Sequence, residues 1–129
     1  MAVDAALQKE EYSTDTGTTS VVVLITPDKI FCANAGDSRA VLWQSTGKTI
    51  ALSEDHKPDN ADELKRIHKS GHMVEDSRVD GNLALSRALG DYQYKDASNL
   101  SPEEHAVTAH PDVTQRDRRK AADVIILAW

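Results

Sequence analysis

The sequence has little cysteine and no long hydrophobic run. Cys32 is the only cysteine among 129 residues, which excludes an internal disulfide and a cysteine-rich zinc site. The most apolar stretches, 21–25 and 124–129, are far too short to span a bilayer. No basic region followed by a long apolar run precedes them, so no signal peptide is expected. We therefore expect no membrane partner and a cytoplasmic location, with the nucleus as the alternative.

Basic and aromatic residues are also scarce. Lys and Arg number 15 against 21 Asp and Glu, which gives a formal net charge of −6, and aromatic residues make up 5%. Because neutralising a phosphate backbone needs a surplus of Lys and Arg, we expect no nucleic-acid partner. With 40% hydrophobic and 28% charged residues, the composition is that of an ordinary globular domain large enough to bury a core.

The first half of the chain has the pattern of antiparallel strands. Strands are expected at 18–25, 29–35, 39–43 and 49–52. The consecutive apolar residues of the first strand predict that both of its faces are covered. Turn residues between the strands predict an antiparallel meander with buried faces. Helices are expected over 2–12 and 61–70, so the fold class is α+β.

The second half of the chain is less regular. Residues 92–104 are expected to form a polar loop, and 107–113 to be extended around a proline. Residues 123–129 have the pattern of a buried strand. A complete domain seldom ends on such a strand, since the unpaired edge invites aggregation. The pattern therefore indicates a partial domain.

Two aspartates follow glycines at the ends of apolar runs. Asp37 comes after Gly36, and Asp91 comes after Gly90. Glycine allows a tight turn and a close approach of a ligand, and carboxylates in such places suit Mg²⁺ or Mn²⁺. Taken singly, each is more often a turn aspartate that bonds its own backbone. The sequence alone leaves both interpretations open.

Other polar clusters are better explained by a structural role than by a catalytic or metal-binding one. Ser53, Asp55 and His56 contain the residue types of a nucleophilic triad, but triad members come from distant parts of a chain. A loop that pins a strand end is the favoured interpretation. His68 and His72 are four residues apart with a glycine between them, which does not suit a helical zinc site.

Five segments, in this order, together resemble a known family. They are 17–25 (GTTSVVVLI), 33–42 (ANAGDSRAVL), 52–58 (LSEDHKP), 78–91 (RVDGNLALSRALGD) and 123–128 (DVIILA). The set closely resembles the metal-dependent serine/threonine protein phosphatases, the protein phosphatase 2C-like family. Five segments in the right order are far more specific than any one of them.

The resemblance implies a fold and a reaction. The family has a sandwich of two antiparallel β-sheets flanked by helices, in α-β-β-α layers. Two or three Mn²⁺ or Mg²⁺ ions lie at one end, and a metal-bridging water attacks phosphoserine or phosphothreonine in a phosphoprotein substrate. By resemblance, Asp91 is a ligand of the catalytic metal pair and Asp37 is a ligand of the looser third metal. The family's mobile flap corresponds to 58–77, within one partial domain over 1–129.

The sequence also departs from the family's pattern. We find no Asp-Gly-His-Gly motif, which supplies a bridging aspartate and a general-acid histidine, and no early arginine that holds the phosphate. Trp129 stands where the family has the cysteine of Cys-Asp-Gly. We therefore expect the chain by itself to bind metal weakly and to be inactive. The alternative is a non-catalytic, phosphatase-like interaction module that covers its apolar sheet by self-association or with a partner.

Overall fold

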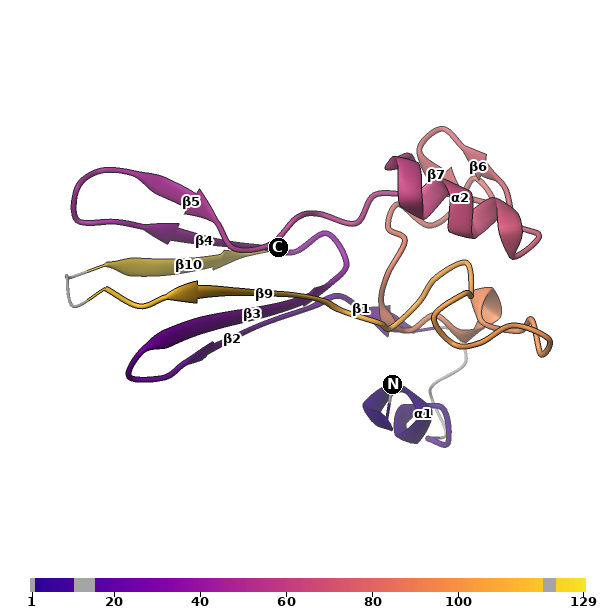
Figure 1. Cartoon of the computed structure of the whole chain (residues 1–129). Helices are drawn as coiled ribbons and strands as arrows, with labels where there is room; N and C mark the ends of the chain where they lie inside the picture. The colour runs from indigo at the N-terminus through magenta and orange to yellow at the C-terminus, as the bar shows by residue number, and fades with distance from the viewer. Residues whose placement is uncertain (1, 11–15, 120–122) are drawn as a thin grey trace.

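Two three-stranded antiparallel sheets form one half of the molecule, which we call the sandwich half (Figure 1). The computed structural model describes residues 2–10, 16–119 and 123–129. One sheet has the order β2-β3-β9, with bounds Ser20–Ile25, Lys29–Ala35 and Asp112–Asp117. The other has the order β10-β4-β5, with bounds Val124–Ala128, Arg39–Trp43 and Thr49–Ala51. The expected antiparallel class is therefore confirmed.

The expected meander is wrong in its connectivity. β3 and β4 are consecutive in the chain but belong to different sheets, and their second partners are β9 and β10 from the far end of the sequence. The chain changes sheets at Gly36, whose φ of +117° is rarely adopted by residues with a side chain. The sandwich thus closes only when distant segments of the chain pair.

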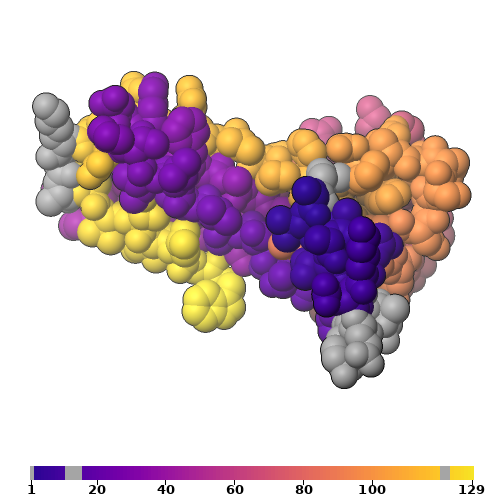
Figure 2. Space-filling view, turned by 90° about the horizontal axis from the view of Figure 1, so that it is seen from below, coloured from indigo at the N-terminus to yellow at the C-terminus, as the bar shows by residue number. Residues whose placement is uncertain are grey.

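The core of the sandwich half lies between the two sheets. It is formed by Ile30, Cys32, Ala40, Leu42 and Leu52, which are all buried. The outer faces remain exposed, because side chains alternate across a strand and only one set points inward. Val22 is 57% exposed and Ile126 is 50% exposed. Covered faces on 18–25 and a buried strand at 123–129 are therefore wrong expectations for the described residues, and β10 lies at the surface (Figure 2).

Short elements and loops form the other half, which we call the loop half (Figure 1). Its elements are α1 Ala2–Leu7, β1 Gly17–Thr18, α2 Ala61–Lys69, β6 Val74–Glu75, β7 Arg78–Val79, β8 Leu89–Gly90 and the 3₁₀ helix η1 Tyr92–Tyr94. A second apolar cluster holds this half together, with Ile67, Val79 and Val107 fully buried. Both α-helices lie at this end of the sandwich (Figure 1). None of the helices in the described part of the chain could cross a membrane.

Local expectations for the loop half are partly correct. The helix over 61–70 is confirmed, apart from its last residue. The helix expected over 2–12 ends at Leu7, and residues 11 and 12 lie outside the described ranges. In the segment expected to be extended at 107–113, a named strand begins only at Asp112, and Val107 packs into the second cluster. The loop expected at 92–104 begins with η1.

Candidate active site

Two glycines let the backbone approach Asp91 closely. Gly17 and Gly90 face each other where β1 pairs with β8, and the Asp91 N–H donates to the Thr16 carbonyl at 2.9 Å. A Cβ atom on Gly17 would lie 2.0 Å from Asp91 Oδ2, and one on Gly90 would lie 2.3 Å from the Thr16 oxygen. Neither position has room for a side chain. The pairing of β1 with β8 therefore leaves room for the Asp91 carboxylate.

Asp91 itself has a left-handed backbone, with φ 53° and ψ 44°. This conformation is uncommon outside glycine, and such strain persists where the surroundings enforce it, often at functional sites. Burial raises the pKa of the Asp91 carboxyl; Lys95 opposes this rise and Asp4 adds to it. A carboxylate in this place is stabilised by any additional positive charge beside it.

Helix α1 secures the segment around Asp91. Asp4 accepts hydrogen bonds from the Gly90 N–H at 2.8 Å and from Lys95 Nζ at 2.9 Å. The Tyr92 hydroxyl donates to the Asp4 carbonyl at 2.7 Å, and Lys95 Nζ also donates to the carbonyl of Ala88. The Lys95 side chain is only 5% exposed. Sequence reasoning missed this pair, because no local pattern links residues 91 positions apart.

Asp37 follows β3 and is held by a loop at 53–58. The Asp37 carboxylate pairs with Lys57 Nζ. In the same loop, Asp55 accepts two bonds from Arg39, at 2.9 and 2.8 Å. The backbone N–H of His56 donates to the Gly36 carbonyl at 3.1 Å. The interpretation of this segment as a loop that pins a strand end is therefore confirmed.

The segment 17–19 contacts the surroundings of both aspartates. Gly17 lies against Asp91, whereas Thr19 lies against the turn that carries Asp37. A Cβ on Gly36 would be 2.4 Å from Thr19 Cγ2, and the Thr19 hydroxyl lies 2.6 Å from that of Ser38. Within residues 2–10, 16–119 and 123–129, no three His, Cys, Asp or Glu side chains form a group that could hold a metal ion. Asp37 and Asp91 are thus at most part of a ligand set.

A buried group of charges lies between α2 and the sandwich. The Glu63 carboxylate accepts bonds from Ser86 Oγ at 2.6 Å, Arg66 Nη2 at 2.8 Å and Arg87 Nη2 at 2.7 Å. Arg87 Nη1 also donates to Asp112 Oδ1 at 2.7 Å. Burial acts to raise the pKa of Glu63, but the bonds from Arg66, Arg87 and Ser86 outweigh it and lower the pKa to about 2. Glu63 is therefore a stable buried anion. Sequence reasoning missed this group as well.

His56 and His72 have structural partners. His56 bonds Asp112 through Nε2, at 3.1 Å, which agrees with the rejection of a triad with Ser53 and Asp55. His72 Nδ1 lies 2.7 Å from Asp80 Oδ2, and its ring lies 5.9 Å from that of Tyr94.

Comparisons with known proteins agree with the motif pattern. The family profile described as "Protein phosphatase 2C" matches residues 2–128. The chain is 48% identical over 125 residues to "Protein phosphatase 2C homolog 3" of Schizosaccharomyces pombe, covering 96% of the chain and 30% of that protein. It is 48% identical over 114 residues to "Protein phosphatase 1G" of Bos taurus, covering 88% of the chain and 21% of that protein. The chain thus spans about a third or less of the length of these relatives.

Solved structures give the same result. A phosphatase from a pathogenic strain of Toxoplasma gondii matches with a TM-score of 0.70 and 46% identity, over 77% of this chain and 30% of that one. A Caenorhabditis elegans sex-determining protein matches with a TM-score of 0.78 over 98% of this chain and 29% of that one. At 22% identity, that second match supports the fold alone. The expected fold class is confirmed, and the chain belongs to the protein phosphatase 2C family.

Proposed function

We propose that this chain is part of a metal-dependent protein phosphatase that hydrolyses phosphoserine and phosphothreonine, with Asp91 and Asp37 as metal ligands. Membership of the family supports the phosphatase reaction. The observation that carries the ligand proposal is the Asp91 carboxylate, which lies against Gly17 in a strained backbone that two glycines make room for. The substrate is a phosphoprotein, and the compartment is the cytoplasm or the nucleus.

The donor atoms suit Mn²⁺ or Mg²⁺. Both ions prefer carboxylate oxygens and keep several waters, so each aspartate need supply only one contact. When bound, such ions lower the pKa of a water and neutralise charge on the phosphoryl oxygens. The chain's own residues provide positioning: Asp4 and Lys95 secure the Asp91 segment, and Lys57 is the existing cationic partner of Asp37.

We also propose that the chain by itself binds these ions weakly and turns over slowly. Two carboxylates hold a binuclear centre poorly. We assign no general acid and no phosphate-binding arginine among the residues of this chain. The segment 58–77, with α2 and β6, is proposed as the flap beside the site.

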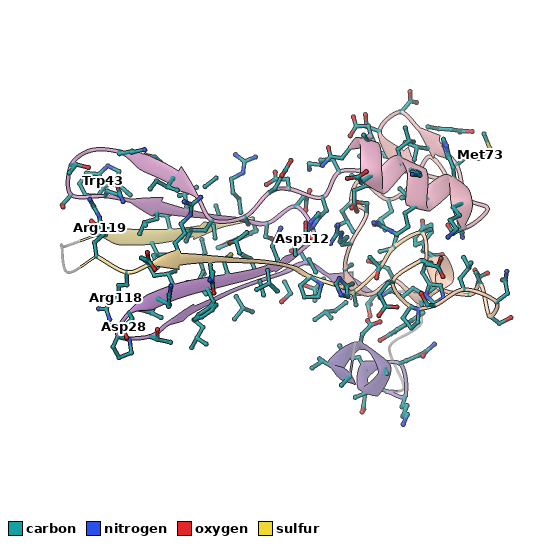
Figure 3. The ribbon with its side chains drawn as sticks, in the orientation of Figure 1. Asp28, Trp43, Met73, Asp112, Arg118 and Arg119 are labelled. Atoms are coloured by element: carbon teal, nitrogen blue, oxygen red, sulfur yellow. The ribbon has the colours of Figure 1, made fainter. Side chains whose placement is uncertain are left out.

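The ligand proposal is tested by Mn²⁺ titration of the ¹⁵N-labelled chain, because the paramagnetic ion broadens the signals of nearby amides. We expect broadening around Asp37 and Asp91. Asp91→Ala should reduce it most strongly around residue 91, whereas the matched control Asp28→Ala, at the far end of the sandwich, should leave it unchanged (Figure 3). Broadening at neither aspartate would contradict the ligand assignment. Calorimetry that finds two tightly bound Mn²⁺ per chain would contradict weak binding.

Activity is tested separately with para-nitrophenyl phosphate in the presence of Mn²⁺, Mg²⁺ or a chelator. We expect little turnover in any of these conditions. Metal-dependent turnover that Asp91→Ala removes would support the ligand role but would contradict the proposed inactivity of the chain by itself.

One observation favours a second candidate, a non-catalytic interaction module. The outer sheet faces are apolar and exposed, with Leu24 at 58% and Ile126 at 50%. Exposed apolar patches often mark interaction surfaces. Sedimentation equilibrium should then show self-association that Leu24→Lys reduces. A monomer at all concentrations would argue against self-association through this surface.

A further inference from the structure

Both ring nitrogens of the buried His56 have defined partners. The side chain is only 4% exposed. Nδ1 lies 3.1 Å from the backbone nitrogen of Gly36, and Nε2 lies 3.1 Å from Asp112 Oδ2. A backbone N–H can only donate, so Nδ1 must be the unprotonated acceptor, and Nε2 carries the proton that Asp112 accepts. The two partners together specify one tautomer of the imidazole.

The bond to Nδ1 fixes the turn that ends in Asp37. Gly36 directly precedes Asp37, and its φ of +117° places its backbone in a region that few residues adopt. The Gly36 carbonyl accepts from Asn34 Nδ2 at 3.0 Å and from the His56 N–H at 3.1 Å. The His56 ring is the side chain that binds the Gly36 N–H. The peptide groups on both sides of Gly36 are therefore anchored, which sets the direction in which the Asp37 side chain leaves the turn.

Asp112 is itself held in place by a buried cation. Its Oδ1 accepts from Arg87 Nη1 at 2.7 Å, while its Oδ2 faces His56 at 3.1 Å. Arg87 in turn donates to Glu63 on α2 at 2.7 Å. The Glu63 side chain is only 4% exposed, whereas that of Asp112 is 59% exposed. Charge-assisted bonds are short and directional, so Arg87 and His56 still orient the Asp112 carboxylate. An unbroken chain of contacts thus runs from α2 through Arg87 and Asp112 to the Asp37 turn.

We propose that His56 is a positioning residue for Asp37, and that Asp112 holds its imidazole in the tautomer that accepts the Gly36 N–H. The inference deepens the proposed function and rests on it, since Asp37 is a metal ligand only there. The metal-binding strength of Asp37 then depends on two residues that touch neither the metal nor the substrate. Partners of this kind orient ligands in many metal sites.

Two single substitutions separate the two bonds of the His56 ring. In His56→Asn the side-chain oxygen takes the place of Nδ1 and keeps the acceptor for Gly36, but the donor to Asp112 is lost. In His56→Gln the amide nitrogen takes the place of Nε2 and keeps that donor, but the acceptor for Gly36 is lost. Mg²⁺ titration of the full chain, followed by the amide shifts of Gly36 and Asp37, gives the affinity at this turn. We expect His56→Gln to weaken it about 10- to 100-fold and His56→Asn to remain close to the unmodified chain.

A third substitution tests the role of Asp112 through a spectroscopic signature. In Asp112→Asn, the side-chain amide can donate to Nε2. The imidazole proton would then lie on Nδ1, where it faces the Gly36 N–H and replaces the acceptor with a second donor. The ¹⁵N shifts of the imidazole identify the protonated ring nitrogen. We expect the Nε2–H tautomer in the unmodified chain and the Nδ1–H tautomer in Asp112→Asn, with faster hydrogen exchange at Gly36. A merely structural role would change stability without changing the tautomer.

The outcomes distinguish this inference from the proposed function. If Mg²⁺ moves no signal near Asp37 in the unmodified chain, the ligand proposal is wrong, and the positioning role is still decided by the tautomer and by exchange at Gly36. If Mg²⁺ binds there and His56→Gln binds it as well as His56→Asn does, the inference is wrong. An Nδ1–H tautomer in the unmodified chain would also overturn it.

Discussion

The sandwich half and the loop half are stabilised in different ways. The sandwich half has an apolar core between two sheets, in which Ala40 and Leu42 are buried without a charged partner. The loop half has an apolar cluster around Ile67 and also buries the charged Glu63 beside Arg87. An apolar core tolerates substitutions that conserve its volume. A buried charge, in contrast, is strongly destabilising when one of its partners is removed. Asp37 follows β3 of the sandwich half and Asp91 follows β8 of the loop half, so each half supplies one candidate ligand.

The largest expected loss of stability comes from disrupting the buried charges of the loop half. Arg87→Met removes the cation between Glu63 and Asp112 while keeping much of the side-chain volume. Because a buried carboxylate would lose a compensating charge, we expect a loss of about 3–5 kcal/mol in the free energy of unfolding. Urea unfolding followed by circular dichroism measures this loss. A loss below about 1 kcal/mol, the size typical of an exposed ion pair, would mean that the buried charges are not coupled in this way.

Acid should weaken the loop half, with its buried Glu63, more than the sandwich half. The pKa of Glu63 is lowered from 4.5 to about 2, so its contribution is complete above the unfolded value and is lost as the pH falls through the folded value. At about 1.4 kcal/mol per pKa unit, the loss amounts to roughly 3 kcal/mol between pH 4.5 and 2. Urea unfolding at several pH values should show this slope, and Glu63→Gln should lack the Glu63 part of it. Equal slopes for both chains would contradict the assignment.

A smaller effect is expected where β1 pairs with β8. The Cβ of Gly17→Ala would fall 2.0 Å from Asp91 Oδ2, so the carboxylate must move. Overpacking of this kind costs about 1–3 kcal/mol. We expect that loss in urea unfolding, together with displaced amide signals at residues 90 and 91. The neighbouring Thr18→Ala, whose side chain is exposed, is the matched control and should change neither. Unchanged signals in Gly17→Ala would show that Gly17 on β1 and Asp91 after β8 are not in close contact.

The same contrast explains which parts of the fold could be predicted from the sequence. The strands Lys29–Ala35 and Arg39–Trp43 were predictable to the residue, because their apolar patterns and turns are local. Their division between two sheets was not, since it depends on pairing with β9 and β10 far along the chain. The role of the loop at 53–58 in holding the end of a strand was also predictable. The pairing of Asp4 with Lys95 was not, because nothing near either residue specifies the other.

The smallest expected effect lies on the outer face of the sandwich. Val22 on β2 is 57% exposed, so Val22→Thr keeps the β-branched shape and removes little buried apolar surface. Exposed substitutions of this kind change stability by at most about 0.5 kcal/mol. Leu42→Ala on the inner face, where the side chain is 4% exposed, should instead cost about 2–5 kcal/mol. Urea unfolding of both variants tests whether a single face carries the stability of each sheet. A loss for Val22→Thr close to that for Leu42→Ala would mean that the outer face is covered in solution, and self-association would then account for the cover.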